Sequence, residues 1–222
     1  MEYSDRKIKS RMIDVEHEQH RYIYRTAKRV FDFVASLIGL VILSPVFLMV
    51  AIAIKLEDPK GPVFYSQVRL GKQQRAFRMY KFRSMVVDAD KKLKKLLNHN
   101  DVEGPMFKMK EDPRVTRVGR FIRKYSVDEL PQLVNVLLGQ MSLVGPRPPL
   151  PREVAEYTEF DKQRLTVKPG CTGLWQVTVR NKVGFEEMVR LDLKYINQRS
   201  VWVDLAVLCK TVLVFFKPNG AY

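Results

Sequence analysis

Residues 31–54 read FDFVASLIGLVILSPVFLMVAIAI, an apolar block of 24 residues whose only charged side chain is Asp32. As a straight helix rising about 1.5 Å per residue, the block would be roughly 36 Å long and would cross the hydrocarbon core of a bilayer. It starts too far into the chain and is too long to be a secretory signal peptide. The block therefore predicts a membrane segment.

The dipeptide Ser44-Pro45 interrupts this block near its middle. A proline inside a helix removes a backbone hydrogen bond and clashes with the preceding turn, and neither half of the block spans a bilayer alone. Basic residues lie on both sides: Arg11, Arg21, Arg25, Lys28 and Arg29 before the block, and Lys55, Lys60, Arg69 and Lys72 after it. Because positive charge marks the cytoplasmic side, we expect a re-entrant helix–break–helix with both ends in the cytoplasm. A Pro-kinked span and a buried core helix are the alternatives.

Composition divides the chain into three expected parts. Residues 1–30 form a polar, amphipathic N-terminal segment, residues 31–54 the broken membrane helix, and residues 55–222 a single domain on the cytosolic face that is continuous with this helix. The fold class expected is α+β, a mostly helical small domain with short strands. The re-entrant segment and interfacial amphipathic helices would anchor it to the membrane.

Local patterns locate some elements of the third part. Residues 62–71 and 75–85 alternate enough to predict two strands joined at Gly71-Lys72. A helix is expected from about Asp128 to Leu138. Residues 201–216 are apolar but contain Asp204 and Lys210, and are too short to span a membrane comfortably. Both an interfacial and a core position are open for this segment.

The net charge of the chain is +15, from 39 Lys and Arg against 24 Asp and Glu. This excess predicts an anionic partner: nucleic acid, anionic lipid or a phosphorylated substrate. Nucleic acid is the least favoured, because the sequence has no binding motif for it and does have a long apolar block. The two cysteines, Cys171 and Cys209, support neither a disulfide framework nor a thiolate zinc site.

An arginine-rich stretch runs directly into two acids in DPRVTRVGRFIRKYSVDELPQL, residues 112–133. Ser126 and Glu129 fit a capping box, so Asp128 and Glu129 have a structural interpretation as helix-capping acids. The functional interpretation is an anion site, since a helix N-terminus beside arginines attracts phosphate. Adjacent helical residues point about 100° apart, so one carboxylate could attack phosphorus while the other holds Mg²⁺.

Two further loops have the composition of phosphate-binding segments. SLVGPRPPLP, residues 142–151, presents Arg147 between prolines, and VKPGCTGLWQV, residues 167–177, carries Thr172 and Trp175. Each is also compatible with a simple structural turn. The usual nucleotide and hydrolase signatures are missing, and the lysine-rich stretch 88–111 receives no role.

Together these pieces resemble the bacterial sugar transferases, or monotopic phosphoglycosyl transferases, of the undecaprenyl-phosphate glucose or galactose phosphotransferase type. The matching pieces are the Ser44-Pro45 break, YKFRSM (80–85), residues 112–133, MSLVGPRPPL (141–150) and PGCTGLWQV (169–177). The resemblance implies transfer of a sugar-1-phosphate from a UDP-sugar to undecaprenyl phosphate, with release of UMP. It places this reaction at the cytoplasmic face of the bacterial cell membrane, as the first membrane step of exopolysaccharide, capsule or other glycoconjugate synthesis.

The resemblance also implies roles for individual residues. Asp128 would be the nucleophile that forms a covalent phosphosugar intermediate, and Glu129 would help to bind Mg²⁺. The expected phosphate-contacting residues are Lys81, Arg123 and Arg147, and the expected nucleotide-sugar loop contains Thr172 and Trp175.

The partners implied are a UDP-sugar, undecaprenyl phosphate and anionic membrane lipids. Larger relatives carry four additional membrane helices and a further domain, so a minimal catalytic form is expected here. Glucose or galactose is the sugar we expect, with an N-acetylated sugar as the alternative, and the oligomeric state is not predicted. The complete set of acidic and basic site residues argues against a non-catalytic scaffold that retains the fold.

Overall fold

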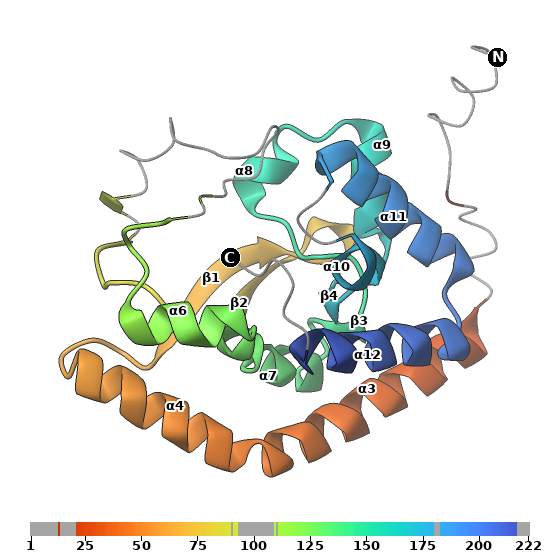
Figure 1. The fold of residues 1–222 in the computed structure, drawn as a ribbon. Coiled ribbons are helices and arrows are strands. Elements are labelled where there is room, and N and C mark those ends of the chain that lie inside the picture. The colour runs from red at the N-terminus through yellow and green to blue at the C-terminus, as the bar shows by residue number, and fades with distance from the viewer. Residues whose placement is uncertain are drawn as a thin grey trace.

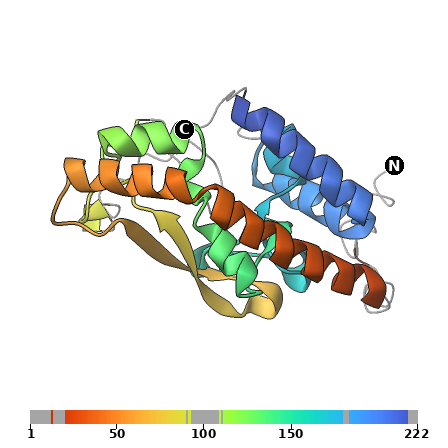
Figure 2. The same ribbon diagram turned by 90° about the horizontal axis from the view of Figure 1, so that it is seen from below.

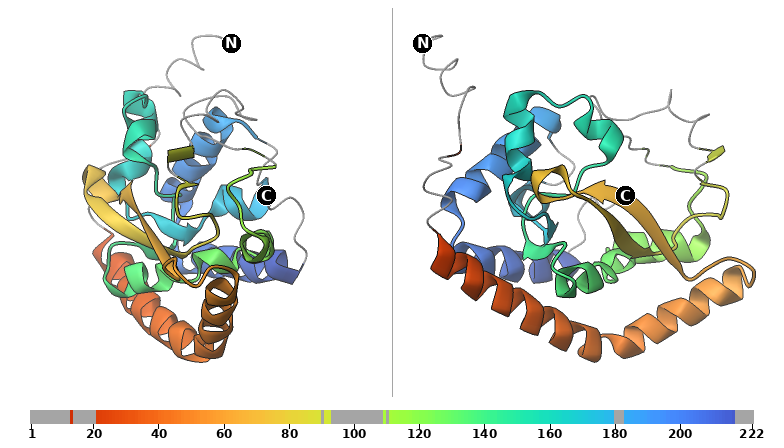
Figure 3. Two further views of the ribbon diagram at one scale, coloured as in Figure 1. Left: turned by 90° about the vertical axis from the view of Figure 1, so that its left-hand side faces the viewer. Right: turned by 180° about the vertical axis from the view of Figure 1, so that it is seen from behind.

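The computed structural model describes residues 13, 21–89, 91–92, 109, 111–179 and 183–216. Helices α3 (Tyr22–Ile42) and α4 (Ser44–Glu57) meet at Leu43 with a bend of 58°. They form a shallow V beneath the rest of the molecule (Figures 1 and 3). In the described part of the chain no single helix is long and apolar enough to cross a membrane, whereas α3 and α4 together meet that test by length and composition.

The helix breaks where the sequence predicts it. Pro45 lies in the first turn of α4, where a proline is tolerated because it breaks no hydrogen bond within α4 itself. The hydroxyl of Ser44 donates to the carbonyl oxygen of Val41 at 2.8 Å, which is the acceptor that a residue with an N–H at position 45 would have used. Ser44 therefore replaces the hydrogen bond that Pro45 cannot make.

The V has an inner face packed on the domain and an uncovered outer face. Asp32, the only charge of the apolar block, is 3% exposed, and its Oδ1 accepts a hydrogen bond from the backbone N–H of Leu143 at 3.1 Å. From α4, Val50 and Ile54 join a core cluster with Phe82 and Ile122. The exposed apolar residues of the two arms include Val34, Leu37, Ile38, Val41, Ile42, Leu48, Met49, Ile52 and Leu56.

Two small sheets lie above the V. Strands β1 (Phe64–Leu70) and β2 (Ala76–Phe82) form an antiparallel hairpin around a short 3₁₀ turn, η1 (Lys72–Gln74). This confirms the two predicted strands. Strands β3 (Ser142–Val144) and β4 (Gly170–Thr172) pair in parallel.

Helices and short 3₁₀ segments make up most of the remainder. They are α6 (Arg117–Lys124), η3 (Val127–Glu129), α7 (Gln132–Leu137), α8 (Pro151–Val154), α9 (Glu159–Lys162), η4 (Gln163–Thr166), α10 (Leu174–Thr178), α11 (Phe185–Gln198) and α12 (Val201–Phe216). The view from below shows α6 alongside α4, and α12 on the same side next to α3 (Figure 2). The architecture is the expected α+β class with short strands.

Each arm of the V holds one end of a helix in the domain. On α3, the guanidinium of Arg29 donates to the carbonyl oxygens of Val136 and Leu137 at 2.7 and 2.8 Å, at the C-terminus of α7. On α4, the carboxylate of Glu57 accepts from the backbone N–H groups of Arg117 and Val118 at 2.7 and 3.1 Å, at the N-terminus of α6. Both contacts satisfy terminal backbone groups with a side chain of the charge that the helix dipole favours.

One helix begins later than the sequence predicts, and the position of another decides between the two alternatives left open for residues 201–216. The helix expected from Asp128 begins only at Gln132, because residues 127–129 form the 3₁₀ turn η3. On α12, Val207 is buried in the core while Trp202 is 80% exposed, so this helix combines a core face with an open apolar face. Its Asp204 is buried and accepts hydrogen bonds from Tyr24, Lys28 and Tyr195.

The helix α3 begins at Tyr22, so it extends into the segment 1–30 that the sequence separates from the apolar block. Most of that N-terminal segment, and most of the lysine-rich stretch 88–111, lie outside the described residues.

Candidate active site

A cavity of about 670 Å³ opens between the hairpin, α6, the proline-rich loop and α10. This volume is in the range typical of small-molecule sites. Every predicted site residue of the domain lines it: Lys81, Arg123, Asp128, Glu129, Arg147, Thr172 and Trp175. The folding of segments distant in sequence therefore brings the predicted residues together.

The acid pair lies on η3, directly after an unusual backbone conformation. Ser126 has φ of 53° and ψ of 21°, in the left-handed region that residues with a side chain seldom adopt. Its side chain makes no capping hydrogen bond. The carboxylate of Glu129 instead accepts from Lys81 Nζ, with Oε1 at 2.6 Å. The capping interpretation of the acid pair is therefore wrong.

The two acids occupy different electrostatic environments. Asp128 is 7% exposed, and burial raises its pKa to about 6, with Glu129 adding to the rise while Lys81 and Arg123 oppose it. Burial also acts to raise the pKa of Glu129, but the positive charges of Lys81 and Arg147 outweigh it and hold that pKa below its ordinary value. Neighbouring carboxyl groups whose pKa values are pushed apart are typical of sites in which the two acids have separate chemical tasks.

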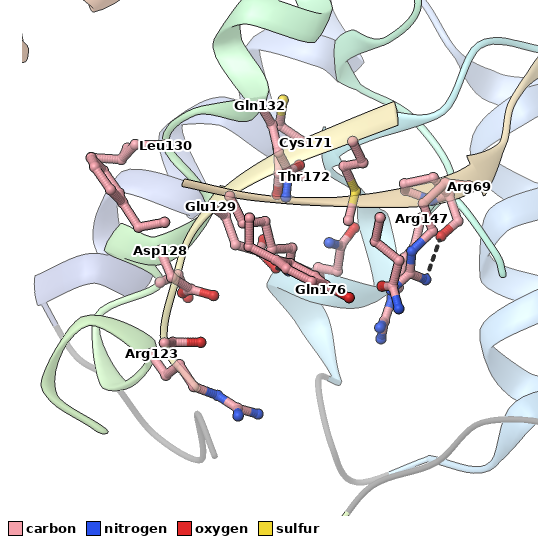
Figure 4. A pocket seen from close by; sticks show the side chains of 18 of the residues that line it. Arg69, Arg123, Asp128, Glu129, Leu130, Gln132, Arg147, Cys171, Thr172 and Gln176 are labelled. Carbon is pink, nitrogen blue, oxygen red and sulfur yellow. Dashed lines mark hydrogen bonds and ion pairs between the residues drawn. The ribbon is translucent and has the colours of Figure 1, made fainter. Parts of the chain in front are cut away.

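Positive charge lies at both ends of the cavity (Figure 4). Asp128 and Arg123 lie at one end, Glu129 lies near the middle, and Arg147 lies with Arg69 at the other end. Guanidinium groups suit phosphate because they donate in a planar fork. The arrangement therefore fits an elongated ligand that carries phosphate between two arginines.

The acid pair is also the donor set available for a cation. In the ranges that the structure describes, no three His, Cys, Asp or Glu side chains gather to hold a metal ion on their own. Mg²⁺ commonly uses only one or two carboxylates, with substrate phosphate oxygens and water completing its shell. Asp128 and Glu129 fit Mg²⁺ bound in this shared way.

The second predicted loop contributes one wall of the cavity. Thr172 Oγ1 lies 2.9 Å from Thr211 Oγ1 on α12, which ties this loop to the last described helix. Trp175 is 7% exposed, and its buried indole N–H finds no partner among the described residues. The buried Oε1 of Gln176 likewise lacks one, so polar atoms are available here for a ligand.

Strand β1 contributes site residues that were not predicted from the sequence. Tyr65, Gln67 and Arg69 all line the cavity, and Tyr65 pairs directly with Lys81 across the hairpin. Because alternate residues of a strand share a face, assigning Lys81 to the site and knowing this register would have pointed to all three. The register depends on how the two strands pair, and alternation along a single strand does not predict it.

Comparison with known proteins identifies the family to which this chain is similar. Residues 23–218 match the family described as "Bacterial sugar transferase". The chain is 47% identical over 203 residues to "Galactosyl transferase CpsE" of Streptococcus agalactiae, which covers 91% of this chain and 45% of that protein. It is 46% identical over 202 residues to "Undecaprenyl-phosphate galactose phosphotransferase" of Salmonella typhimurium, covering 89% of this chain and 42% of that protein.

A third relative has a similar length. "Exopolysaccharide production protein ExoY" of Rhizobium meliloti is 38% identical over 200 residues, covering 88% of each chain. By contrast, the chain spans less than half the length of the first two relatives.

Proposed function

This chain belongs to the bacterial sugar transferase family, and on that basis we propose the reaction that it catalyses. It transfers a sugar-1-phosphate from a UDP-sugar to undecaprenyl phosphate and releases UMP. The observation that carries the proposal is the buried Asp128, with its raised pKa, in a cavity that also holds the Glu129–Lys81 ion pair, Arg123 and Arg147. The names of the two longer relatives, which refer to galactosyl transfer and to undecaprenyl phosphate, support this substrate class.

The reaction is two displacements at one phosphorus atom. In the first, a carboxylate oxygen of Asp128 bonds to the phosphorus nearest the sugar, and the bond from that phosphorus to the bridging oxygen breaks, so that UMP leaves. In the second, a phosphate oxygen of undecaprenyl phosphate bonds to the same phosphorus, and the aspartyl–phosphorus bond breaks. The product is undecaprenyl diphosphate-sugar, and Asp128 is regenerated. A covalent intermediate of this kind divides one difficult exchange between two bulky substrates into two easier steps.

The surrounding charges support both displacements. Phosphoryl transfer depends mainly on positioning and on stabilising charge at the phosphate oxygens. Arg123, Arg147 and Lys81 supply positive charge from the wall of the cavity. Glu129, whose pKa is held low, would hold Mg²⁺ together with the substrate. That ion supplies further positive charge to the phosphate oxygens when it is bound.

The proposed location is the cytoplasmic face of the bacterial cell membrane. The uncovered apolar outer face of the V and the 58° bend support a re-entrant segment that dips into one leaflet. The net charge of +15 suits an anionic lipid surface and two phosphorylated substrates. The site would then lie at the depth where a lipid phosphate and a soluble nucleotide sugar meet.

The test is a UMP-release assay on the purified full chain in nanodiscs, with a panel of UDP-sugars that begins with UDP-galactose and UDP-glucose. We expect UMP to appear before lipid is added, in an amount no greater than the enzyme, and to turn over once undecaprenyl phosphate is present. The mass of the intact protein should rise by one sugar phosphate, and peptide mapping should place the added mass on the peptide that contains residue 128.

Asp128→Asn should abolish both UMP release and the added mass, whereas Glu156→Gln, at an exposed acid, should change neither. The covalent route would be wrong if UMP appeared only when both substrates were present. The function itself would be wrong if no UDP-sugar of the panel gave UMP under either condition.

A further inference from the structure

The loop that carries Arg147 is held in place almost entirely through its carbonyl oxygens. Pro146, Pro148 and Pro149 have no backbone N–H, so Arg147 supplies the only backbone donor in four consecutive residues. A segment of this kind cannot make an ordinary strand ladder. Its conformation must therefore be fixed by donors from elsewhere in the protein.

Those donors are present at every position. Each of the four consecutive carbonyl oxygens accepts a hydrogen bond: Pro146 from Gly170 N at 2.9 Å, Arg147 from Arg164 Nη2 at 3.3 Å, Pro148 from Arg69 Nη1 at 3.0 Å, and Pro149 from Leu70 N at 3.0 Å. Two of the donors are backbone groups of neighbouring strands. The central two are buried guanidinium groups from different parts of the chain.

Both guanidinium groups are fixed on their other side by the protein. Arg69 is 6% exposed, and its second terminal nitrogen donates to Gln67 Oε1 at 2.8 Å. Arg164 is 5% exposed, forms an ion pair with Asp192, and donates to the hydroxyl of Tyr157 at 3.0 Å. Each guanidinium is therefore a rigid donor, because its own partners restrict its rotation.

Burying Arg69 in this position is electrostatically unfavourable. Its pKa is lowered to about 10, mainly by burial and also by the neighbouring positive charge of Arg147. A buried charge costs stability unless it is well paired. The hydrogen-bond acceptors of Arg69 are neutral oxygens, and the carboxylates of Glu153 and Glu129 offset the cost only in part. Such a cost is typical of a residue retained for what it does at a site.

We propose that Arg69 and Arg164 are positioning residues that fix the main chain at Pro148 and Arg147 and so direct the Arg147 guanidinium into the cavity. This rests on the proposed function in one respect, that Arg147 contacts a substrate phosphate. Neither arginine needs to touch the substrate itself. Arg69 lines the cavity, and its Nε finds no partner among the described residues. Both of its terminal nitrogens donate to protein oxygens, and these two bonds favour a supporting role.

A double-mutant cycle distinguishes support from direct contact. The variants are Arg69→Met, Arg147→Met and the two combined, in the full chain in detergent micelles with Mg²⁺ present. The readouts are the affinity for UDP by calorimetry and, separately, the kcat and KM of UMP release. We expect each single variant to weaken UDP binding about tenfold, which corresponds to about 1.4 kcal/mol. The combined variant should bind UDP no more weakly than Arg147→Met alone.

This lack of additivity follows because Arg69 would have nothing to position once the Arg147 side chain is gone. If the fold-losses of UDP affinity in the two single variants multiplied in the combined variant, the proposal would be overturned, since residues that act independently give additive free energies. A general loss of stability would also multiply with the loss at Arg147, so a merely structural role fails the same test. An Arg147→Met variant with unchanged UDP affinity would overturn it as well.

The same cycle with Arg164→Met should give the same pattern. If either methionine variant fails to fold, as judged by thermal unfolding, Arg69→Lys and Arg164→Lys replace it. A lysine keeps the charge and one donor, so UDP affinity should lie between the wild-type and methionine values, and the difference should vanish when Arg147 is methionine. Arg78→Met, at an exposed arginine of β2, is the matched control and should leave UDP affinity unchanged.

The UDP measurement also separates this proposal from the proposed function. If no UDP-sugar yields UMP but the UDP affinities still show the non-additive pattern, the positioning roles stand and the transfer reaction fails. If UMP is released but the losses multiply, the reaction stands and the positioning roles fail.

Discussion

At the scale of single residues, Asp128 is a carboxyl group that the fold buries at a cost to its own ionised form. Its pKa is raised to about 6, above the ordinary value of 3.8. A group with a raised folded-state pKa contributes stability that is present below its unfolded pKa and is lost as the pH rises through its folded pKa. Near neutral pH, the metal-free protein should therefore be less stable than it would be with a neutral side chain at this position.

This predicts the sign of a pH effect on Asp128→Asn. In EDTA, the variant should melt at a higher temperature than the wild type at pH 7.5. The difference should be much smaller at pH 4.5, where Asp128 is protonated in the folded protein, and should disappear only below the unfolded pKa of 3.8. The gain at pH 7.5 should be about 1–3 kcal/mol. Thermal unfolding at the two pH values measures it.

A control with the opposite electrostatics is available. The pKa of the exposed Asp88 is held below its ordinary value, mainly by the hydrogen bond from Lys92, so Asp88→Asn should not raise the melting temperature at pH 7.5. A melting difference for Asp128→Asn that is the same at both pH values would contradict the argument.

Glu129 carries the second prediction, which concerns Mg²⁺. Glu129→Gln removes a carboxylate charge and weakens the contact with Lys81, so we expect UMP release to fall by at least about tenfold, the effect of losing about 1.4 kcal/mol of transition-state stabilisation. Titrating Mg²⁺ should show a higher half-saturating concentration and a slight recovery of rate in excess Mg²⁺. Asp128→Asn should not recover at any concentration, and an unchanged half-saturating concentration in Glu129→Gln would exclude a metal-binding role.

At the scale of elements, the break between α3 and α4 depends on two adjacent side chains with opposite effects on one carbonyl. Pro45 leaves Val41 O without its helical donor, and Ser44 restores a donor. Within a bilayer, an unsatisfied carbonyl costs several kcal/mol. In the proposed re-entrant arrangement, the serine would therefore make the proline acceptable at that depth.

The prediction at this scale compares two substitutions. Ser44→Ala should keep the bend but lower the melting temperature, because Val41 O loses the Ser44 hydroxyl as a donor. Pro45→Ala restores a backbone N–H and should straighten the segment towards a single span. Exposure of a cysteine at position 23 to an impermeant reagent in intact cells would detect that change. If neither variant changed the melting temperature or the labelling, the hydrogen bond from Ser44 would have no part in the bend.

Sequence patterns predicted the strands and the helix break well, but not the exact start of the helix that follows the acid pair. The hairpin followed from alternation along each strand, and the break followed from a single proline. The start of α7 did not follow, because the left-handed backbone at Ser126 and the 3₁₀ turn after it leave no trace in a residue pattern that also fits a capping box. The position of Arg164 beside Arg147 depends on burial against Asp192, and no local pattern reports it.

At the scale of the whole molecule, the cavity joins residues that are more than 90 positions apart, from Lys81 to Trp175. Each of the seven predicted residues that line it was proposed singly, through motifs and through resemblance to a family. The sequence did not give the distances between them, which depend on the packing of the hairpin, α6 and α10. This is also why Arg69, on a strand that was predicted, was not assigned to the site.

The whole-molecule prediction concerns membrane topology. Single cysteines are introduced at Ile23 or at Lys60, both exposed positions near the ends of the V, in a chain whose Cys171 and Cys209 are both replaced by serine. Both should resist a membrane-impermeant reagent in intact cells and should react once the cells are permeabilised. Labelling of position 23 from outside would establish a true span and exclude the re-entrant arrangement.

The two contacts by which α3 and α4 hold the ends of α7 and α6 have a mechanical consequence. Arg29 and Glu57 lie on opposite arms, and the acid pair lies on the chain between the two helices that they hold. Opening or closing the V therefore moves both neighbours of the acid pair. Bilayers of different thickness impose different tilts on apolar helices to relieve hydrophobic mismatch. The lateral pressure of the lipid would then act on the reaction centre itself, and acyl-chain length would set the catalytic rate much as temperature or ionic strength does for a soluble enzyme.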